Sequence, residues 1–162
     1  LELYRAPEKL IYRFINRQLV FAYDDRQRLT LNSCNVVIPH IPGLDMRYIM
    51  AILNSRVAQY IYEKRYNAVK VLRSHIENIP VPVADEETQR RIISKAEELM
   101  AEELITESSV NSEMQTYKTG KDHLQRYRLY EEIDDIVRKL YSVTDEEYEF
   151  IKQSLSGDKY ML

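Results

Sequence analysis

The chain has 162 residues, of which 44% are hydrophobic and 30% charged, and its net charge is −3. This length allows one sizeable core, or a modest core with a helical addition. No apolar run approaches the roughly 18 residues that a membrane span needs, and the first residues show no signal-peptide pattern. A single cysteine, Cys34, excludes an internal disulfide framework and is typical of the reducing cytoplasm, where we expect the protein to be located.

The two halves of the chain carry opposite charge. Residues 1–80 contain 12 Lys and Arg against 7 Asp and Glu, which gives +5. Residues 81–162 contain 11 against 19, which gives −8. If the protein binds a polyanion, we expect the first half to make the contact.

Residues 9–38 are rich in aromatic and β-branched side chains and predict a β-meander. Asn16 and Arg17 form a plausible tight hairpin between the first two strands, and the polar segment 24–27 predicts the next turn. Pro39 then ends the sheet, because proline cannot donate a hydrogen bond to a neighbouring strand.

One long amphipathic helix is predicted next. Asp45 is a good N-cap residue, and apolar side chains recur every three or four positions from there to about residue 65. Residues 67–72 could form a further short strand. The proline-containing segment 78–83 predicts an extended edge or exit from the domain.

The acidic half predicts helices. Asp85 caps the first of them, and Thr144 with Glu147 forms a capping box at the start of the last. The segment 106–120 is polar and weakly periodic, which indicates a loop or a frayed helical linker. Residues 156–162 are expected to be a loose tail.

These elements together predict an α+β fold. A small, mostly antiparallel sheet and the long helix would occupy residues 1–83. A C-terminal helical subdomain would occupy 84–155, with a flexible linker at 106–120 and the tail at 156–162.

The sequence offers little catalytic chemistry. Its three glycines are too far apart for a phosphate-binding loop, and His40, His75 and His123 are isolated from other metal ligands. The acidic pairs 24–25 and 134–135 indicate turn chemistry and a solvated helix face rather than acid/base machinery. We therefore expect no catalytic or metal site in this chain.

Basic side chains in the first half are interleaved with aromatic residues, and most of them are arginines, which suit phosphate groups and guanine edges. The alternative is a solvated basic face, since cations at a helix C-terminus are favoured by the helix dipole in any case. The candidate DNA contacts are Arg13, Arg17, Arg26, Arg28, Lys64, Arg65, Lys70, Arg73 and His75. Arg56, on the long helix, belongs to the same basic set.

Several segments, in order, resemble a known family. They are "LTLNSCNVVIP", "YIMAILNSRVAQYIYEKRY", "VKVLRSHIENIPVP" and "YEEIDDIVRKLYSVTDEE". The series is similar to the TaqI-like C-terminal specificity domain of adenine-specific DNA methyltransferases from type II restriction-modification systems. The resemblance runs over about 8–83 and resumes over 84–105 and 129–151.

The resemblance implies a target-recognition domain that binds double-stranded DNA. S-adenosylmethionine and the flipped adenine would be bound by a separate N-terminal methyltransferase domain of the same parent chain. The family's Asn-Pro-Pro-aromatic type of motif needs adjacent prolines, and none are adjacent here, so we expect this chain to be a fragment that carries no cofactor. Within the motif "LRSHIENIPVP", Arg73 and His75 serve either phosphate contact or the structure of a turn.

Two other function classes stay open at this point. The acidic helices could form a protein-protein interaction module, with self-association through the helices as one form of it. A nuclease or other hydrolase that uses residues without a recognisable pattern is the second alternative.

Overall fold

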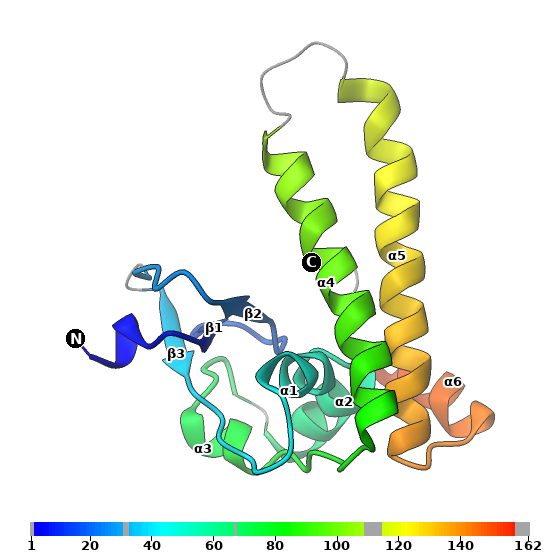
Figure 1. Cartoon of the computed structure of the whole chain (residues 1–162). Coiled ribbons are helices and arrows are strands. Elements are labelled where there is room, and N and C mark those ends of the chain that lie inside the picture. Colours follow the sequence, from blue (N-terminus) through cyan, green and yellow to red (C-terminus); the bar gives the residue numbers. More distant parts are fainter. Residues whose placement is uncertain (1, 31–32, 67, 109–114, 158–162) are drawn as a thin grey trace.

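The computed structural model describes residues 2–30, 33–66, 68–108 and 115–157, with the backbone alone for 102–108 and 115–122. It confirms the α+β class: an antiparallel sheet packs against helices, and two long helices project away from it (Figure 1). The elements are the 3-10 helix η1 (Leu3–Arg5), β1 (Lys9–Arg13), β2 (Phe21–Asp24), β3 (Cys34–Val37), α1 (Met46–Leu53), α2 (Arg56–Arg65), α3 (Arg73–Glu77), α4 (Glu86–Ser108), α5 (Gln115–Leu140) and α6 (Asp145–Ser154).

The sheet has β1 in its centre, with the order β2-β1-β3. Tyr12 of β1 lies opposite Phe21 of β2, and Arg13 lies opposite Cys34 of β3. The predicted meander is therefore wrong, because the third strand returns to the first instead of extending the second. The connection between β1 and β2 covers residues 14–20, so it is also longer than a tight two-residue turn.

A short antiparallel ribbon continues β1 beyond the end of β3. Ile15 and Lys70 form an isolated bridge, and the N–H groups beside it donate to the opposite carbonyls at 2.8 and 3.1 Å. The expected strand at 67–72 amounts to this bridge among the described residues. The chain then enters α3 at Arg73, a short helix that the sequence did not predict.

The long helix expected after Asp45 is two helices that meet at Asn54 and Ser55. Asp45 caps α1 as predicted, since its carboxylate accepts the N–H of Arg47 at 2.8 Å. Ser55 caps α2, because its hydroxyl oxygen accepts the N–H of Ala58 at 3.1 Å. Both helices bury their apolar stripes in the same core, so the apolar periodicity runs through the break and does not reveal it.

The hydrophobic core is continuous across residue 83. It combines the inner face of the sheet, both short helices, and the ends of α4 and α5 nearest the sheet. Its large, fully buried members include Leu10, Leu19, Tyr48, Ile52, Tyr62, Ile92 and Val137. The helical half thus contributes to the core on which the sheet rests.

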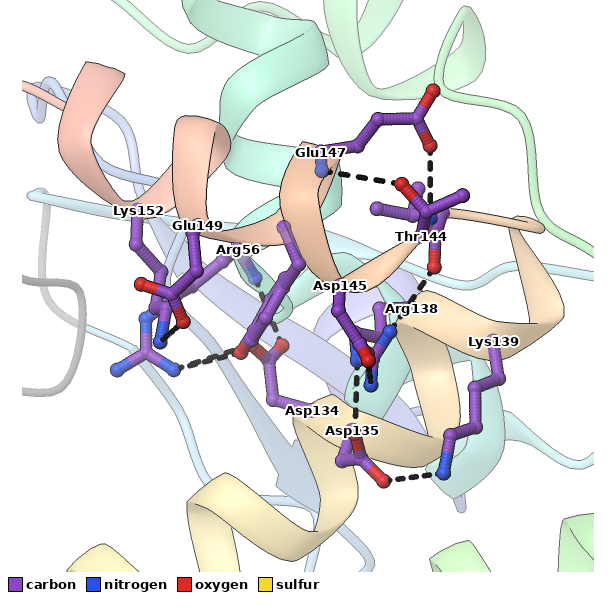
Figure 2. A network of polar contacts seen from close by, with 12 residues as sticks. Arg56, Asp134, Asp135, Arg138, Lys139, Thr144, Asp145, Glu147, Glu149 and Lys152 are labelled. Atoms are coloured by element: carbon purple, nitrogen blue, oxygen red, sulfur yellow. Dashed lines mark hydrogen bonds and ion pairs between the residues drawn. The ribbon is translucent and has the colours of Figure 1, made fainter.

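Two helices of the acidic half, α4 and α6, begin where the predicted caps place them. Asp85 accepts the N–H of Thr88 at 2.7 Å, and Thr144 and Glu147 form the expected capping box (Figure 2). Helices α4 and α5 run antiparallel as a hairpin, and α6 packs beside α2 (Figure 1). In the segment expected as a linker, helix covers 106–108 and 115–120, and 109–114 lie outside the described residues.

Gln89 fastens α4 to the start of α1. Its side-chain amide donates to the carbonyls of Gly43 and Ala84, both at 3.0 Å, and its carbonyl accepts the N–H of Asp45 at 3.3 Å. Gly43 has a φ of 80°, a left-handed conformation that favours glycine. One buried amide therefore satisfies three backbone groups at the junction of the two halves.

A buried ion pair joins α2, α5 and α6. Arg56 and Asp134 are 3% and 2% exposed, and Arg56 Nη1 lies 3.2 Å from Asp134 Oδ2 (Figure 2). The N–H of Arg56 also donates to Asp134 Oδ1 at 3.0 Å, and Arg56 Nη2 lies 2.6 Å from Glu131 Oε1. The hydroxyl of Tyr148 on α6 donates to the same Asp134 carboxylate.

The guanidinium of Arg56 stays charged in this setting. Burial lowers the pKa of Arg56, but the bond to Glu131 and the charge of Asp134 raise it further than burial lowers it. The prediction of a solvated helix face is therefore wrong for Asp134, although it holds for its more exposed neighbour Asp135. Asp134 and Asp135 have different environments because successive residues of a helix face different directions.

Asp134→Ala is expected to lower the free energy of unfolding by about 3–5 kcal/mol, because it removes the main partner of a buried charge. Asp135→Ala is the matched control: Asp135 pairs with Arg138 and Lys139 near the surface, and its loss should cost less than about 1 kcal/mol. Urea denaturation followed by circular dichroism measures both. Equal losses in the two variants would contradict the assigned role of the buried pair.

Candidate nucleic-acid interface

Four of the nine side chains predicted to contact DNA lie at two ends of the sheet. Arg13 ends β1, and Arg17 follows in the loop to β2. Arg26 and Arg28 follow β2, whose last residue lies beside the first residue of β1. β1 has five residues, so these two places are about 13 Å apart along the strand. The spacing is compatible with contacts to one duplex lying along the sheet.

Four of the candidates are exposed cations for which the described part of the chain provides no acidic partner. These are Arg13, Arg17, Lys64 and Lys70, which we call the basic edge. Lys64 Nζ lies 5.3 Å from the ring centre of Tyr60, and Lys70 Nζ lies 5.7 Å from that of Phe14. Such contacts orient an ammonium group without neutralising it, so the four charges remain available to an anion.

Two other candidates are engaged within the protein. Arg65 Nη1 donates to the carbonyl of Asn78 at 2.5 Å, which ties the end of α2 to the end of α3. His75 accepts the N–H of Leu72 at 3.3 Å through Nδ1, and its ring stacks on Tyr66 with centroids 4.0 Å apart. These contacts give Arg65 and His75 structural roles around α3.

Arg73 differs from these two because its partner among the described residues, Glu77, lies on the surface. Its Nε lies 2.6 Å from Glu77 Oε1 one helical turn away, and both side chains are exposed. A surface pair of this kind contributes little stability and is easily exchanged for another anion. Arg73 is therefore neutralised in the free protein, yet open to solvent.

Arg26 and Arg28 lie on a turn that Asp24 organises. The Asp24 carboxylate pairs with the buried ammonium of Lys9 on β1 and accepts the N–H of Arg28 at 2.9 Å and of Arg26 at 3.3 Å. Gln27, between them, has a φ of 54°. The prediction that Asp24 organises a turn is thus confirmed. Its carboxylate is buried beside Lys9 and is not exposed to solvent.

Two side-chain amides hold the free edge of the β2 region. Asn54 accepts the N–H of Phe21 and donates to its carbonyl, both at 2.8 Å. Gln59 accepts the N–H of Leu19 at 2.8 Å and donates to the carbonyl of Arg17 at 3.1 Å. Each amide provides the donor and acceptor that a further strand would provide, and Gln59 thereby fixes the backbone of one basic-edge residue.

Sequence reasoning did not identify Asn54 and Gln59 as positioning residues. A signal was available, because both are polar residues that interrupt the apolar stripe of the predicted helix. A buried amide needs hydrogen-bond partners, and the neighbouring β2 edge has unpaired backbone groups. Which segment would supply those partners depends on the tertiary packing.

Residues 1–81, half of the chain, match the family model described as the TaqI-like C-terminal specificity domain. The chain belongs to this family. Membership confirms the resemblance over these residues, while the resemblance over 84–105 and 129–151 lies outside the match, and it implies DNA target recognition in restriction-modification systems. No curated protein matches the chain in a sequence comparison.

All nine candidate contacts lie in the matched part of the specificity domain, but Arg56 does not join them at its surface. The sequence placed Arg56 with the basic set, and the structure buries it against α5. A helical position alone does not show whether an arginine faces solvent or a carboxylate from a distant helix. Arg56 is therefore a structural residue of the specificity domain.

In the part of the chain that the structure describes, no helix is long and apolar enough to cross a membrane. Over the same residues, no three His, Cys, Asp or Glu side chains gather in a way that could hold a metal ion.

The Lys9–Asp24 pair predicts acid sensitivity. Burial raises the pKa of Asp24, but the bonds from Lys9 and from the N–H groups of Arg26 and Arg28 lower it more, so it lies below its usual value. A carboxyl group with a depressed folded-state pKa stabilises the fold above the unfolded-state value, near pH 4, and this contribution is lost as the pH falls through the folded-state value.

Asp24→Asn should therefore be less stable than the native protein at neutral pH and should lose less stability on acidification. Urea denaturation at about pH 7 and about pH 3 measures the difference. Asp25→Asn, at the exposed neighbouring position, should keep the native pH dependence. An unchanged pH dependence in Asp24→Asn would contradict the assignment.

Gln59→Leu should free the loop that carries Arg17. The variant keeps the side-chain size but leaves the N–H of Leu19 and the carbonyl of Arg17 unpaired, so we expect a loss of about 1–3 kcal/mol and faster exchange of the Leu19 amide. Gln153→Leu, at an exposed position on α6, serves as the control. Hydrogen exchange followed by NMR measures the protection of the Leu19 amide. Native protection of this amide in Gln59→Leu would refute the role assigned to Gln59.

Proposed function

We propose that this chain recognises a specific duplex DNA sequence on behalf of a restriction-modification methyltransferase. The observation that carries the proposal is the basic edge. Its four cations are exposed, lack acidic partners among the described residues, and lie in the region that matches the specificity-domain family. A general solubilising surface mixes both signs of charge. Here Arg13, Arg17 and Lys70 lie at the end of β1 or just beyond it, and Lys64 lies in the last turn of α2.

The two groups of cations suit different tasks. The basic edge would bind phosphates, which sets the position of the protein on the duplex without reading its sequence. The turn that carries Arg26 and Arg28 is fixed by Asp24 and exposes two arginines at the far end of the sheet. An arginine fixed in this way can donate two hydrogen bonds to a guanine edge, which is a sequence-specific contact.

The acidic helices would lie away from the DNA. The α4–α5 hairpin projects from the body of the chain (Figure 1), and the second half carries the negative charge. We propose that these helices contact the neighbouring methyltransferase domain or another subunit. That domain would bind S-adenosylmethionine and methylate adenine, as the family resemblance implies, and would lie in the same parent chain.

A helical protein-protein interaction module without DNA contact is the competing proposal. It is favoured by the projecting hairpin, on which Leu124 and Tyr127 are exposed. This alternative predicts partner binding that survives when Lys64, Arg65 and Lys70 are replaced by alanine. It also predicts no salt-dependent binding of duplex DNA.

DNA binding should depend steeply on salt. If the four cations of the basic edge neutralise four phosphates, the slope of log affinity against log salt should be about −3.6, and Lys70→Ala should reduce its magnitude by about 0.9. Fluorescence anisotropy with a labelled duplex, on the chain joined to its catalytic domain, measures the slope.

Lys139→Ala is the control for this experiment. Lys139 is an exposed lysine of α5 that pairs with Asp135 at 2.8 Å, so its loss should leave the slope unchanged. Absence of salt-dependent duplex binding at low ionic strength would refute the proposed function. Equal effects of Lys70→Ala and Lys139→Ala would show that the basic edge is not the DNA contact.

A further inference from the structure

Among the described residues, the helices pack against one face of the sheet. Along β1, Leu10 and Tyr12 are buried toward the helices, and the intervening residues Ile11 and Arg13 alternate to the opposite side. Helices α1, α2 and α3 lie below the sheet in the view of Figure 1. We call the opposite side the open face, and Arg13 is among its exposed residues.

Partners in register point to the same side of an antiparallel pair, so the pairing defines which side chains share the open face. The first row on this side, Lys9 with Asp24, is buried and neutralised within itself. Three further rows follow along the strand: Ala22 with Ile11 and Val36, Arg13 with Cys34, and Ile15 with Lys70. No side chain of these three rows is acidic. The open face thus passes from a small apolar row to two cations and one large apolar side chain.

Ile15 is the unusual member of this surface. It is 64% exposed, and it lies opposite Lys70 in the short ribbon and two residues after Arg13. The pair is of the non-hydrogen-bonded type, in which side chains come closest. A single exposed isoleucine is ordinary on protein surfaces, but this one is fixed between two cations that lack described acidic partners.

Such a surface is complementary to the major groove of DNA. A two-stranded antiparallel ribbon fits into that groove, whose edges are lines of phosphates. The floor of the groove displays the 5-methyl group of thymine, for which apolar side chains provide the contact. An apolar protein partner would fit Ile15 but would leave Arg13 and Lys70 without an opposite charge.

We propose that the open face lies against the major groove of DNA, with Ile15 in contact with the methyl group of a thymine. This inference rests on the function proposed above. Arg13 and Lys70 hold the flanking phosphates. Ile15 is then a specificity-determining residue for thymine, and the short ribbon is the element that enters the groove.

Cys34 offers a direct test of the position of this face. It lies opposite Arg13 and is partly exposed, so its thiol reports on whatever covers the open face. In the full-length protein, alkylation by N-ethylmaleimide can be followed by mass spectrometry on the tryptic peptide 29–47. We expect saturating duplex DNA to slow this alkylation.

The methyl contact is tested with two versions of one duplex. A duplex selected by the native full-length protein from a randomised pool is amplified with either dTTP or dUTP, which leaves every phosphate in place and removes every thymine methyl group. The native protein should bind the uracil version about fourfold less tightly, the factor for one methyl group lost from an apolar contact. Ile15→Ala should bind both versions equally.

Val83→Ala is the matched control, because Val83 is also an exposed apolar residue, 82% exposed, and lies outside the sheet. It should keep the native preference for thymine. Unchanged alkylation of Cys34 in a complex that does form, or the native preference persisting in Ile15→Ala, would overturn the inference and leave the proposed function standing. Absence of any duplex binding would refute both.

Discussion

The arrangement of the whole chain depends on the buried pair of Arg56 and Asp134. Two charges removed from water are stable only when their hydrogen bonds are complete, and here Glu131, Tyr148 and a backbone N–H complete them. The pair joins the first turn of α2, inside the family match, to α5, outside it. The specificity domain therefore does not end physically at residue 81, since one of its central helices is capped by a carboxylate from the acidic half.

Buried polar side chains also fix the position of the loops at the edge and at the end of the sheet. Asn54 and Gln59 bind one edge, and Asp24 with Lys9 fixes the opposite end. The loops that expose arginine are thus held by hydrogen bonds to buried side chains, and the exposed side chains themselves contribute little to the fold. Under the proposed function, substitutions of the exposed arginines would change DNA contacts with little effect on the fold.

Local signals in the sequence predicted the ends of helices well and the pairing of distant segments poorly. Asp45, Asp85 and the Thr144–Glu147 box are caps whose partners lie within four residues, so they can be identified without a structure. The strand order and the burial of Asp134 depend on contacts between residues far apart in the chain. The nine candidate cations came from charge and resemblance, and only the structure shows that Arg65 and His75 bind within the protein.

The contact made by Gln89 has a mechanical consequence. It attaches α4 at its base to the loop before α1, while the far end of the 23-residue helix extends away from the body. Such a helix is about 35 Å long, so a rotation of about 5° at the base displaces the tip by about 3 Å. The hairpin therefore has the geometry of a lever arm, in which a small rotation where Gln89 holds α4 corresponds to a much larger displacement at the distant end.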